Sequence, residues 1–441
     1  MKGEVITINF DENKVRGRAV LVALDMYRKK GDITFTDSLS ELGELAHAAN
    51  FEVVKTFTQS KDKPEGATYI GKGKIEEIKL FIDTNDIDQV IFDNELGGIQ
   101  IRNLNDIFDV AVMDRTALIL DIFASRATSK EGKLQVEIAN LKYQLPRLIG
   151  MGEMLSRIGG GGSGATKGLG ETKLELDRRI LDKRMIDAQK ALAEVKKHRE
   201  VRRKARKKST IPTVALVGYT NAGKSTIMNH FMDMDEDNPE RTISPAKDML
   251  FATLDPFHRK VKLRDNLEFI LVDTVGFVSK LPHTLIEAFK STLEEVEEAD
   301  LLLYVTDIAR EDSEHQLKVT RDVVEDLKSE ETPHLIVYNK IDKLEGNELE
   351  ERKDKENENT MYISALENTG VDKLVDEIEN VLFRGNKTLT LMVPFSRGDV
   401  SSYLLGNTKV ISQEYTGEGL LITTSLTPED RNRYSSFIVT D

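Results

Sequence analysis

Residues 213–226 read Thr-Val-Ala-Leu-Val-Gly-Tyr-Thr-Asn-Ala-Gly-Lys-Ser-Thr, and this stretch decides the fold. Its first five residues are apolar or β-branched, as in a buried strand, and a helical pattern follows. Gly218 and Gly223 enclose four residues and precede Lys224 and Ser225. Glycines let the backbone curl so that successive N–H groups point at phosphate oxygens. The spacing predicts a strand, a phosphate-binding loop and a helix.

The loop predicts a nucleotide site that also binds Mg²⁺. Lys224 is expected to bridge the β- and γ-phosphates, and Ser225 to bind the metal through its hydroxyl. A Gly-rich turn between a strand and a helix can also be purely structural, but a Lys-Ser pair in register favours phosphate binding. The predicted nucleotide contacts in this loop are Gly218, Tyr219, Thr220, Asn221, Ala222, Gly223, Lys224, Ser225 and Thr226.

Two segments further along the chain fit the same site. Asp273 ends an apolar run and is followed by Gly276, so we expect the carboxylate to hold Mg²⁺ through its water shell and the glycine N–H to meet the γ-phosphate. Thr253 lies between the loop and Asp273, as a switch threonine would, although alone it is typical of an ordinary loop. The predicted contacts are Phe251, Ala252, Thr253, Asp273, Thr274, Val275 and Gly276. The predicted metal ligands are Ser225, Thr253 and Asp273, and the predicted catalytic residues are Lys224, Thr253 and Gly276.

The run Asn339-Lys340-Ile341-Asp342 predicts the base. The Asp342 carboxylate can accept from both N1–H and the exocyclic amine of guanine, which adenine does not offer. Ser364 and Ala365, after the next strand-like run, are expected to direct a backbone N–H at the guanine O6. The predicted ligands are therefore GTP and GDP, with Asn339 and Lys340 as further contacts. From Ser209 onward the motif order resembles that of Ras-like GTPases.

The residue after Gly276 is Phe277, where many such GTPases carry a glutamine that orients the attacking water. Phe277 is also an ordinary core residue in type. We expect slow intrinsic hydrolysis that rises when a partner binds.

The chain of 441 residues exceeds what one core usually organises. Alternating strand and helix patterns predict a multidomain α/β protein. An N-terminal α/β domain (1–124) precedes a helical hairpin (125–208) with a Gly-rich tip (149–170). A Ras-like doubly wound domain (209–384) and a small C-terminal α+β domain (385–441) follow. Within the last domain, residues 388–441 predict the order strand, helix, strand, strand and helix. Across the hairpin we expect contacts from Leu174, Ile180 and Leu181.

Charge is unevenly distributed in this chain. The net charge is −14, yet residues 196–208 are almost wholly basic. With the flexible tip Ser156–Gly170 this run favours a phosphate backbone as partner, recognised by shape and charge, and structured RNA fits best. By composition alone the tip is typical of a solvent-exposed linker. The absence of cysteine, of a signal peptide and of a long apolar run favours a cytoplasmic protein without membrane insertion, and we expect a monomer.

The chain resembles the HflX ribosome-associated GTPases. Beside the nucleotide motifs, the resemblance rests on the Gly-rich tip leading into residues 168–175, on the run 251–255 and on residues 273–277. It implies GTP-dependent binding to the ribosome, mainly to the rRNA of the large subunit near the peptidyl-transferase centre. It also implies splitting of stalled or idle ribosomes into subunits, in a stress response, with release on GTP hydrolysis.

Two departures concern the tip. Lys173 and Leu176 stand where the family commonly has Gln and Thr, and this affects how the tip acts at the catalytic centre.

Residues Gly71–Lys74 lack the spacing of a second phosphate loop, and they are interpreted equally well as a basic turn on rRNA or a plain turn.

The sequence also fits other functional classes. The chain is also interpreted as a module that blocks subunit joining, with hydrolysis serving recycling only, or as a factor in large-subunit biogenesis. A GTPase that gates tRNA modification would need a catalytic Cys or a dinucleotide motif, and the sequence has neither.

Overall fold

The computed structural model describes residues 15–26, 33–158, 167–206, 211–233, 250–251, 256–263, 267–281, 293, 295–325, 332–352 and 359–439. The chain forms two compact units. The first unit contains residues 1–208, 247–255 and 276–292, and the second unit contains 209–246, 256–275 and 293–441. Two short segments from the Ras-like part of the sequence therefore belong to the first unit. The four predicted domain boundaries stay a prediction.

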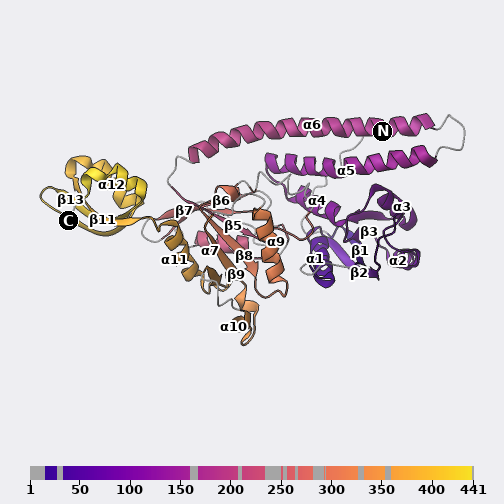
Figure 1. Cartoon of the computed structure of the whole chain (residues 1–441), viewed down its shortest axis with the longest axis horizontal. Helices are drawn as coiled ribbons and strands as arrows, with labels where there is room; N and C mark the ends of the chain where they lie inside the picture. The colour runs from indigo at the N-terminus through magenta and orange to yellow at the C-terminus, as the bar shows by residue number, and fades with distance from the viewer. Residues whose placement is uncertain are drawn as a thin grey trace. The chain divides into compact units, whose positions relative to one another are not determined.

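A parallel sheet in the order β2-β1-β3-β4 forms the centre of the first unit (Figure 1). Helix α1 packs with α4, and α2 packs with α3. Because apolar strands such as Ala-Val-Leu-Val-Ala at 19–23 are buried on both faces, they read as continuous apolar runs. The elements are β1 (Gly17–Asp25), α1 (Phe35–Ala48), β2 (Phe51–Ser60), α2 (Lys72–Asn85), β3 (Gln89–Phe92), α3 (Gly98–Phe108), β4 (Ala111–Asp114) and α4 (Arg115–Arg126).

The turn predicted at Gly71–Lys74 is the start of a helix. Gly71 is the N-cap residue of α2, and Lys72 opens the helix. The predicted alternation of strands and helices over this part of the chain is confirmed.

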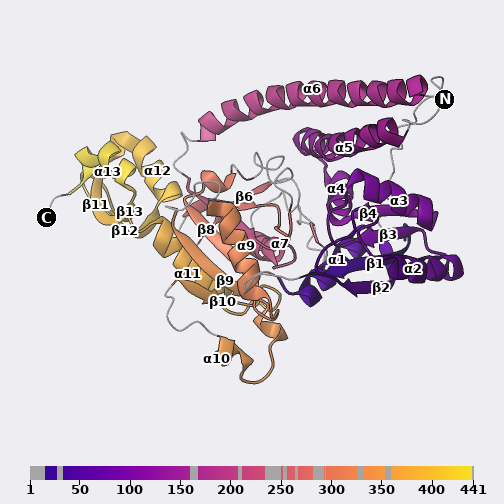
Figure 2. The ribbon, with the colours of Figure 1, turned by 45° about the vertical axis from the view of Figure 1, so that its right-hand side comes forward.

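Helices α5 (Lys130–Ile158) and α6 (Lys167–Arg206) lie side by side as the predicted antiparallel hairpin (Figures 1 and 2). Pro146 lies inside α5. The helices extend into the predicted tip 149–170, so only residues 159–166 remain as the connection, outside the described residues.

Packing across the hairpin differs from the prediction at one position. Ile180 is 50% exposed, whereas Leu181 is half-buried and begins a stripe with helical spacing. The stripe comprises Leu181, Met185, Ala188, Leu192 and Val195. The side chain of Leu174, and those of the basic run beyond Lys197, lie outside the described residues.

The second unit contains the predicted doubly wound sheet, in the order β10-β9-β8-β5-β7-β6. Its strands are parallel except β6, which is antiparallel to β7. The elements are β5 (Thr213–Gly218), α7 (Lys224–Asp233), β6 (Phe257–Lys262), β7 (Glu268–Asp273), β8 (Leu301–Asp307), α9 (Ser313–Glu325), β9 (His334–Asn339), α10 (Glu348–Arg352), β10 (Thr360–Tyr362) and α11 (Val371–Leu382).

The C-terminal part of this unit has the predicted order of strand, helix, strand, strand and helix. Its antiparallel sheet runs β11-β13-β12 and has a core of its own around Leu391, Leu404 and Ile422. The elements are β11 (Lys387–Pro394), α12 (Gly398–Asn407), β12 (Lys409–Tyr415), β13 (Gly419–Leu426) and α13 (Pro428–Arg433). Among the described helices of the whole chain, none is long and apolar enough to cross a membrane.

Candidate nucleotide-binding site

The carboxyl ends of four neighbouring parallel strands meet at one edge of the second-unit sheet. They end at Gly218 (β5), Asp273 (β7), Asp307 (β8) and Asn339 (β9). In open parallel sheets this is the edge at which ligands bind. The residues predicted from separate motifs are therefore brought to one place by the topology.

Neighbouring atoms lie so close to positions 218 and 223 of the phosphate loop that only glycine fits there. A Cβ on Gly223 would lie 2.1 Å from the Nδ2 atom of Asn339, and Gly223 has a left-handed backbone with φ +97°. A Cβ on Gly218 would lie 2.2 Å from the carbonyl oxygen of Val305 on β8. The loop thus lies against β8 and the end of β9 at distances that exclude any side chain.

Lys224 is buried at the base of this loop. Its Nζ atom donates to the carbonyl oxygens of Gly218 and Tyr219 at 2.9 and 2.8 Å. Burial lowers the pKa of the Lys224 ammonium to about 8, against the opposing effect of the Asp273 carboxylate. The charged form still predominates at neutral pH, which is the form that binds phosphate.

The residues present fit a phosphate with a bound cation. Ser225 donates through Oγ to Oδ2 of Asp273 at 2.8 Å, and Asp273 is fully buried at the end of β7. Hydroxyl and carboxylate oxygens are the ligands that Mg²⁺ prefers. Thr220 Oγ1 is buried in the loop with no hydrogen-bond partner among the described residues, as expected of a group that faces a polar ligand.

The side-chain amide of Asn339 ties the phosphate loop to the base-recognition loop. Its Nδ2 donates to the carbonyl oxygen of Ala222 at 3.0 Å, and its Oδ1 accepts from the N–H of Ala365 at 3.0 Å. Lys340, with a left-handed φ of 67°, donates through Nζ to the carbonyl oxygen of Asn221 at 2.6 Å. The amide therefore sets the separation between phosphate and base contacts.

Asp342 is held by Ser364, whose Oγ donates to Oδ1 of Asp342 at 2.5 Å. Asp342 is half-buried, and Ser364 is fully buried. A carboxylate has two oxygens with about four acceptor sites, so this bond fixes its orientation and leaves capacity for two guanine donors. The geometry suits the predicted contact with the base.

One residue of this edge was not predicted. Asp307 ends β8, is 5% exposed and forms an ion pair with the Nζ of Lys340 at 2.9 Å. Its carboxylate also accepts from the N–H of Ala309 at 3.1 Å. The signal was an acidic residue closing the apolar run 301–307, the same pattern that identified Asp273.

Three of the predicted contacts have other partners in the described structure. The ring of Phe251 is buried edge-to-face on Phe123 of α4, with 4.5 Å between ring centroids, and its predicted nucleotide contact stays a prediction. Thr274 donates through its hydroxyl to the carbonyl oxygen of Leu216 at 2.6 Å, joining β7 to β5. Gly276 opens the segment that belongs to the first unit. Ala252 and Thr253 lie outside the described residues.

Comparison with known proteins divides the chain into three matched regions. Residues 36–124 match the family described as GTP-binding GTPase N-terminal, 126–206 match the GTP-binding GTPase middle region, and 213–340 match the 50S ribosome-binding GTPase family. The first two matched regions meet near residue 125, in the last turn of α4.

Several curated relatives cover nearly the whole chain, and each is named GTPase HflX. One from Caldanaerobacter subterraneus subsp. tengcongensis is 46% identical and covers 96% of this chain and 94% of its own. One from Lacrimispora saccharolytica is 39% identical, covering 93% of each chain. One from Escherichia coli K12 is 39% identical, covering 89% of each.

We expect Gly223→Ala to lower nucleotide affinity at least about tenfold. A left-handed backbone costs a residue with a Cβ about 1–2 kcal/mol, and displacement of the Asn339 amide adds to this. Binding of fluorescently labelled GDP measures it. Gly346→Ala is the matched control, because Gly346 has φ +57° but open space around the added carbon. An equal drop in affinity in both variants would contradict the role of the Asn339 contact.

Asp342→Asn is expected to shift binding from GTP toward xanthosine triphosphate by at least about tenfold. The amide cannot accept from both guanine donors, whereas xanthine offers a carbonyl where guanine has its amine. Competition of both nucleotides against labelled GDP measures the preference. Unchanged GTP affinity would remove Asp342 from base recognition.

Proposed function

Because this chain belongs to the HflX family of GTPases, and is therefore a GTP hydrolase, we propose that it binds the ribosome in its GTP-bound form and splits stalled or idle ribosomes into subunits. The large subunit is the main partner, and GTP hydrolysis releases the protein. It acts in the cytoplasm as a monomer.

The observation that carries this proposal is the helical hairpin. Helix α6 has 40 residues, which corresponds to about 60 Å at 1.5 Å per residue. In the sequence, the Gly-rich residues 159–166 join the end of α5 to the start of this helix. A probe of this length suits a deep site in rRNA, and near the peptidyl-transferase centre is where we propose that it binds.

The basic run 196–208 supplies the electrostatic attraction to rRNA. Arg and Lys side chains that neutralise phosphates release counterions, which gives affinity without base recognition. Basic residues earlier on α6 already have acidic partners: Arg179 pairs with Glu175 at 2.6 Å, and Arg184 with Glu137 at 2.9 Å. The excess positive charge is therefore concentrated in the run near the end of α6.

For hydrolysis, we propose that Lys224 stabilises charge on the β- and γ-phosphates and that the Gly276 N–H contacts the γ-phosphate. Ser225, Asp273 and Thr253 would hold Mg²⁺, which supplies further charge neutralisation when bound. Phe277 is only 4% exposed and cannot orient a water molecule. The ribosome is proposed to supply the missing catalytic group, so that release follows binding.

Two assays test the function. Sedimentation of the full chain with 70S ribosomes and with separated subunits should give co-migration with a slowly hydrolysed GTP analogue and none with GDP. A subunit-dissociation assay should then show splitting with GTP. If the analogue prevented reassociation of subunits but never separated intact ribosomes, the protein would be an anti-association factor instead.

Neutralising Arg202, Arg203, Lys204 and Arg206 together should weaken ribosome binding. It should also reduce the slope of log affinity against log salt by up to about four, one for each phosphate that is no longer neutralised. Sedimentation over a series of salt concentrations measures the slope.

The control variant neutralises Arg178 and Arg179, exposed side chains of the same helix whose partners are Asp182 and Glu175. We expect its slope to match that of the parent chain. A slope that stays the same in the fourfold variant would make the basic run an ordinary solvated face.

A further inference from the structure

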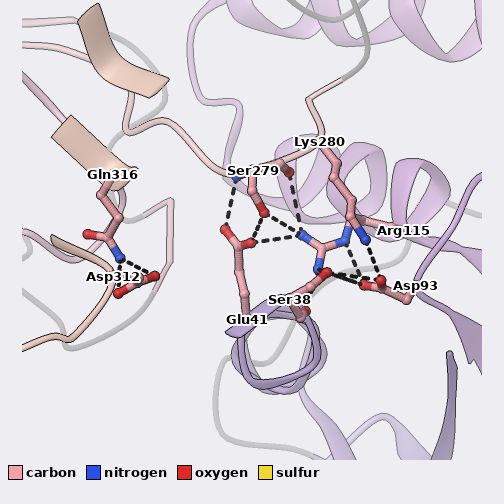
Figure 3. A network of polar contacts seen from close by, with 8 residues as sticks. All are labelled: Ser38, Glu41, Asp93, Arg115, Ser279, Lys280, Asp312 and Gln316. Atoms are coloured by element: carbon pink, nitrogen blue, oxygen red, sulfur yellow. Dashed lines mark hydrogen bonds and ion pairs between the residues drawn. The ribbon is translucent and has the colours of Figure 1, made fainter. Parts of the chain in front are cut away.

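Arg115, the first residue of α4, is a buried arginine at the centre of a polar network (Figure 3). Its guanidinium is 2% exposed and pairs with Glu41 of α1 at 3.0 Å and with Asp93, directly after β3, at 2.7 Å. It also donates to the carbonyl oxygen of Ser38 at 2.6 Å. The network lies in the first unit, yet it is completed by residues from the Ras-like part of the sequence.

Ser279 and Lys280 enter this network from the segment 276–281, which follows the Asp273 motif (Figure 3). The Ser279 N–H donates to Oε1 of Glu41 at 3.1 Å, and its hydroxyl donates to the same carboxylate. The ammonium of Lys280 pairs with Asp93. Each buried carboxylate thus has a partner from α4 and a partner from the segment, and Asp93 also accepts from the Ser38 hydroxyl at 2.9 Å.

Charge balance makes the segment necessary to this site. Without Lys280, one guanidinium would face two buried carboxylates, which leaves a net negative charge among side chains that are at most 4% exposed. Burial tends to raise the pKa of Asp93, but the positive charges of Arg115 and Lys280 outweigh it and keep that pKa below its usual value. Because an unbalanced buried charge is strongly unfavourable, the site favours the bound segment.

The position of the network in the sheet is that of a ligand site. Asp93 follows β3 and Arg115 follows β4, so both lie at the carboxyl edge of the parallel sheet β2-β1-β3-β4. In open parallel sheets small ligands bind at this edge. Here Ser279 and Lys280 of the same chain occupy it.

Two segments of the first unit, 276–281 and 247–255, each include a residue with a strained backbone. Lys280 and Phe251 are both non-glycine residues with left-handed backbones, φ 56° and 57°. Lys280 contacts the network around Arg115, and Phe251 packs on Phe123 of the same helix. Such conformations persist only where surrounding contacts enforce them, and they cluster at switch regions. Both segments that flank the nucleotide motifs are therefore held by α4.

Helix α4 is in turn fastened to the hairpin. Asp114, its N-cap residue, accepts from the Tyr143 hydroxyl at 2.9 Å and pairs with Arg147 at 3.3 Å, both on α5. A displacement of the start of α4 would thus be transmitted to α5 through one buried carboxylate.

We propose that the carboxyl edge of the first-unit sheet is a receptor site for residues 276–281 and that the bound nucleotide sets its occupancy through Gly276. Gly276, which is expected to meet the γ-phosphate, is only three residues from Ser279. GTP and GDP therefore impose different positions on a segment whose other end is fixed by Arg115, Glu41 and Asp93. This goes beyond ribosome binding, because it couples the nucleotide to α4 and α5 within the free protein.

Hydrogen exchange on the full chain without ribosomes tests the proposal. Amides of 36–45, 93–97 and 113–120 should exchange at rates that differ by at least about fivefold between the complexes with GDP and with a slowly hydrolysed GTP analogue, the lower range of measured couplings between sites. In Lys280→Ala the difference should fall below about twofold while GDP affinity is retained. Lys280→Arg, which keeps the charge, should restore it.

Lys409→Ala is the control, since it removes a lysine that pairs with Glu379 at 2.9 Å in the second unit. It should leave the nucleotide-dependent difference unchanged. Equal exchange of the three regions in both nucleotide complexes of the parent chain would overturn the proposal, as would a difference that persists undiminished in both Lys280→Ala and Ser279→Ala. Neither result bears on ribosome binding, which is absent from the assay.

Discussion

The nucleotide site depends on one buried amide. Asn339 joins the carbonyl of Ala222 to the N–H of Ala365, so the phosphate loop and the base loop are held at a fixed separation by two hydrogen bonds from a single side chain. The same amide leaves no room for a Cβ at position 223. Glycine there is a consequence of Asn339 as much as of phosphate binding. The contacts for the phosphates and for the base are thus held at a fixed separation before the ligand binds. Fewer loop and side-chain conformations then have to be ordered on binding.

Local patterns predicted most of this site because each motif carries its own context. A strand, a Gly-rich turn and a helix are contiguous in sequence around Lys224, and Asp273 and Asn339 each close an apolar run. Parallel topology then brings strand ends together without further information. Asp307 follows the same rule and was identifiable from the residues 301–307. The α/β alternation, the hairpin and the C-terminal order of elements were predicted for the same reason.

The features that were not predicted depend on tertiary packing, which the spacing of residues in the sequence does not encode. The Arg115 network joins positions 41, 93, 115 and 279, and each residue alone looks like an ordinary charged or polar surface residue in the sequence. The motif that contains Phe251 does not encode the packing of its ring on Phe123, a residue much earlier in the sequence. Ile180 and Leu181 are adjacent apolar residues, and only the partner helix decides which of them is buried. Helix ends within the Gly-rich tip were equally beyond local patterns.

Pro146 gives the hairpin a mechanical property. Proline has no N–H to donate within the helix, so the turn of α5 that contains it is expected to bend more easily than the rest. Tyr143 and Arg147 stand on either side of this turn, and both contact the carboxylate of Asp114. Because both contacts end on the same buried carboxylate, they resist bending of α5 at this turn. The resistance of this turn to bending therefore depends on Asp114, a residue outside the hairpin.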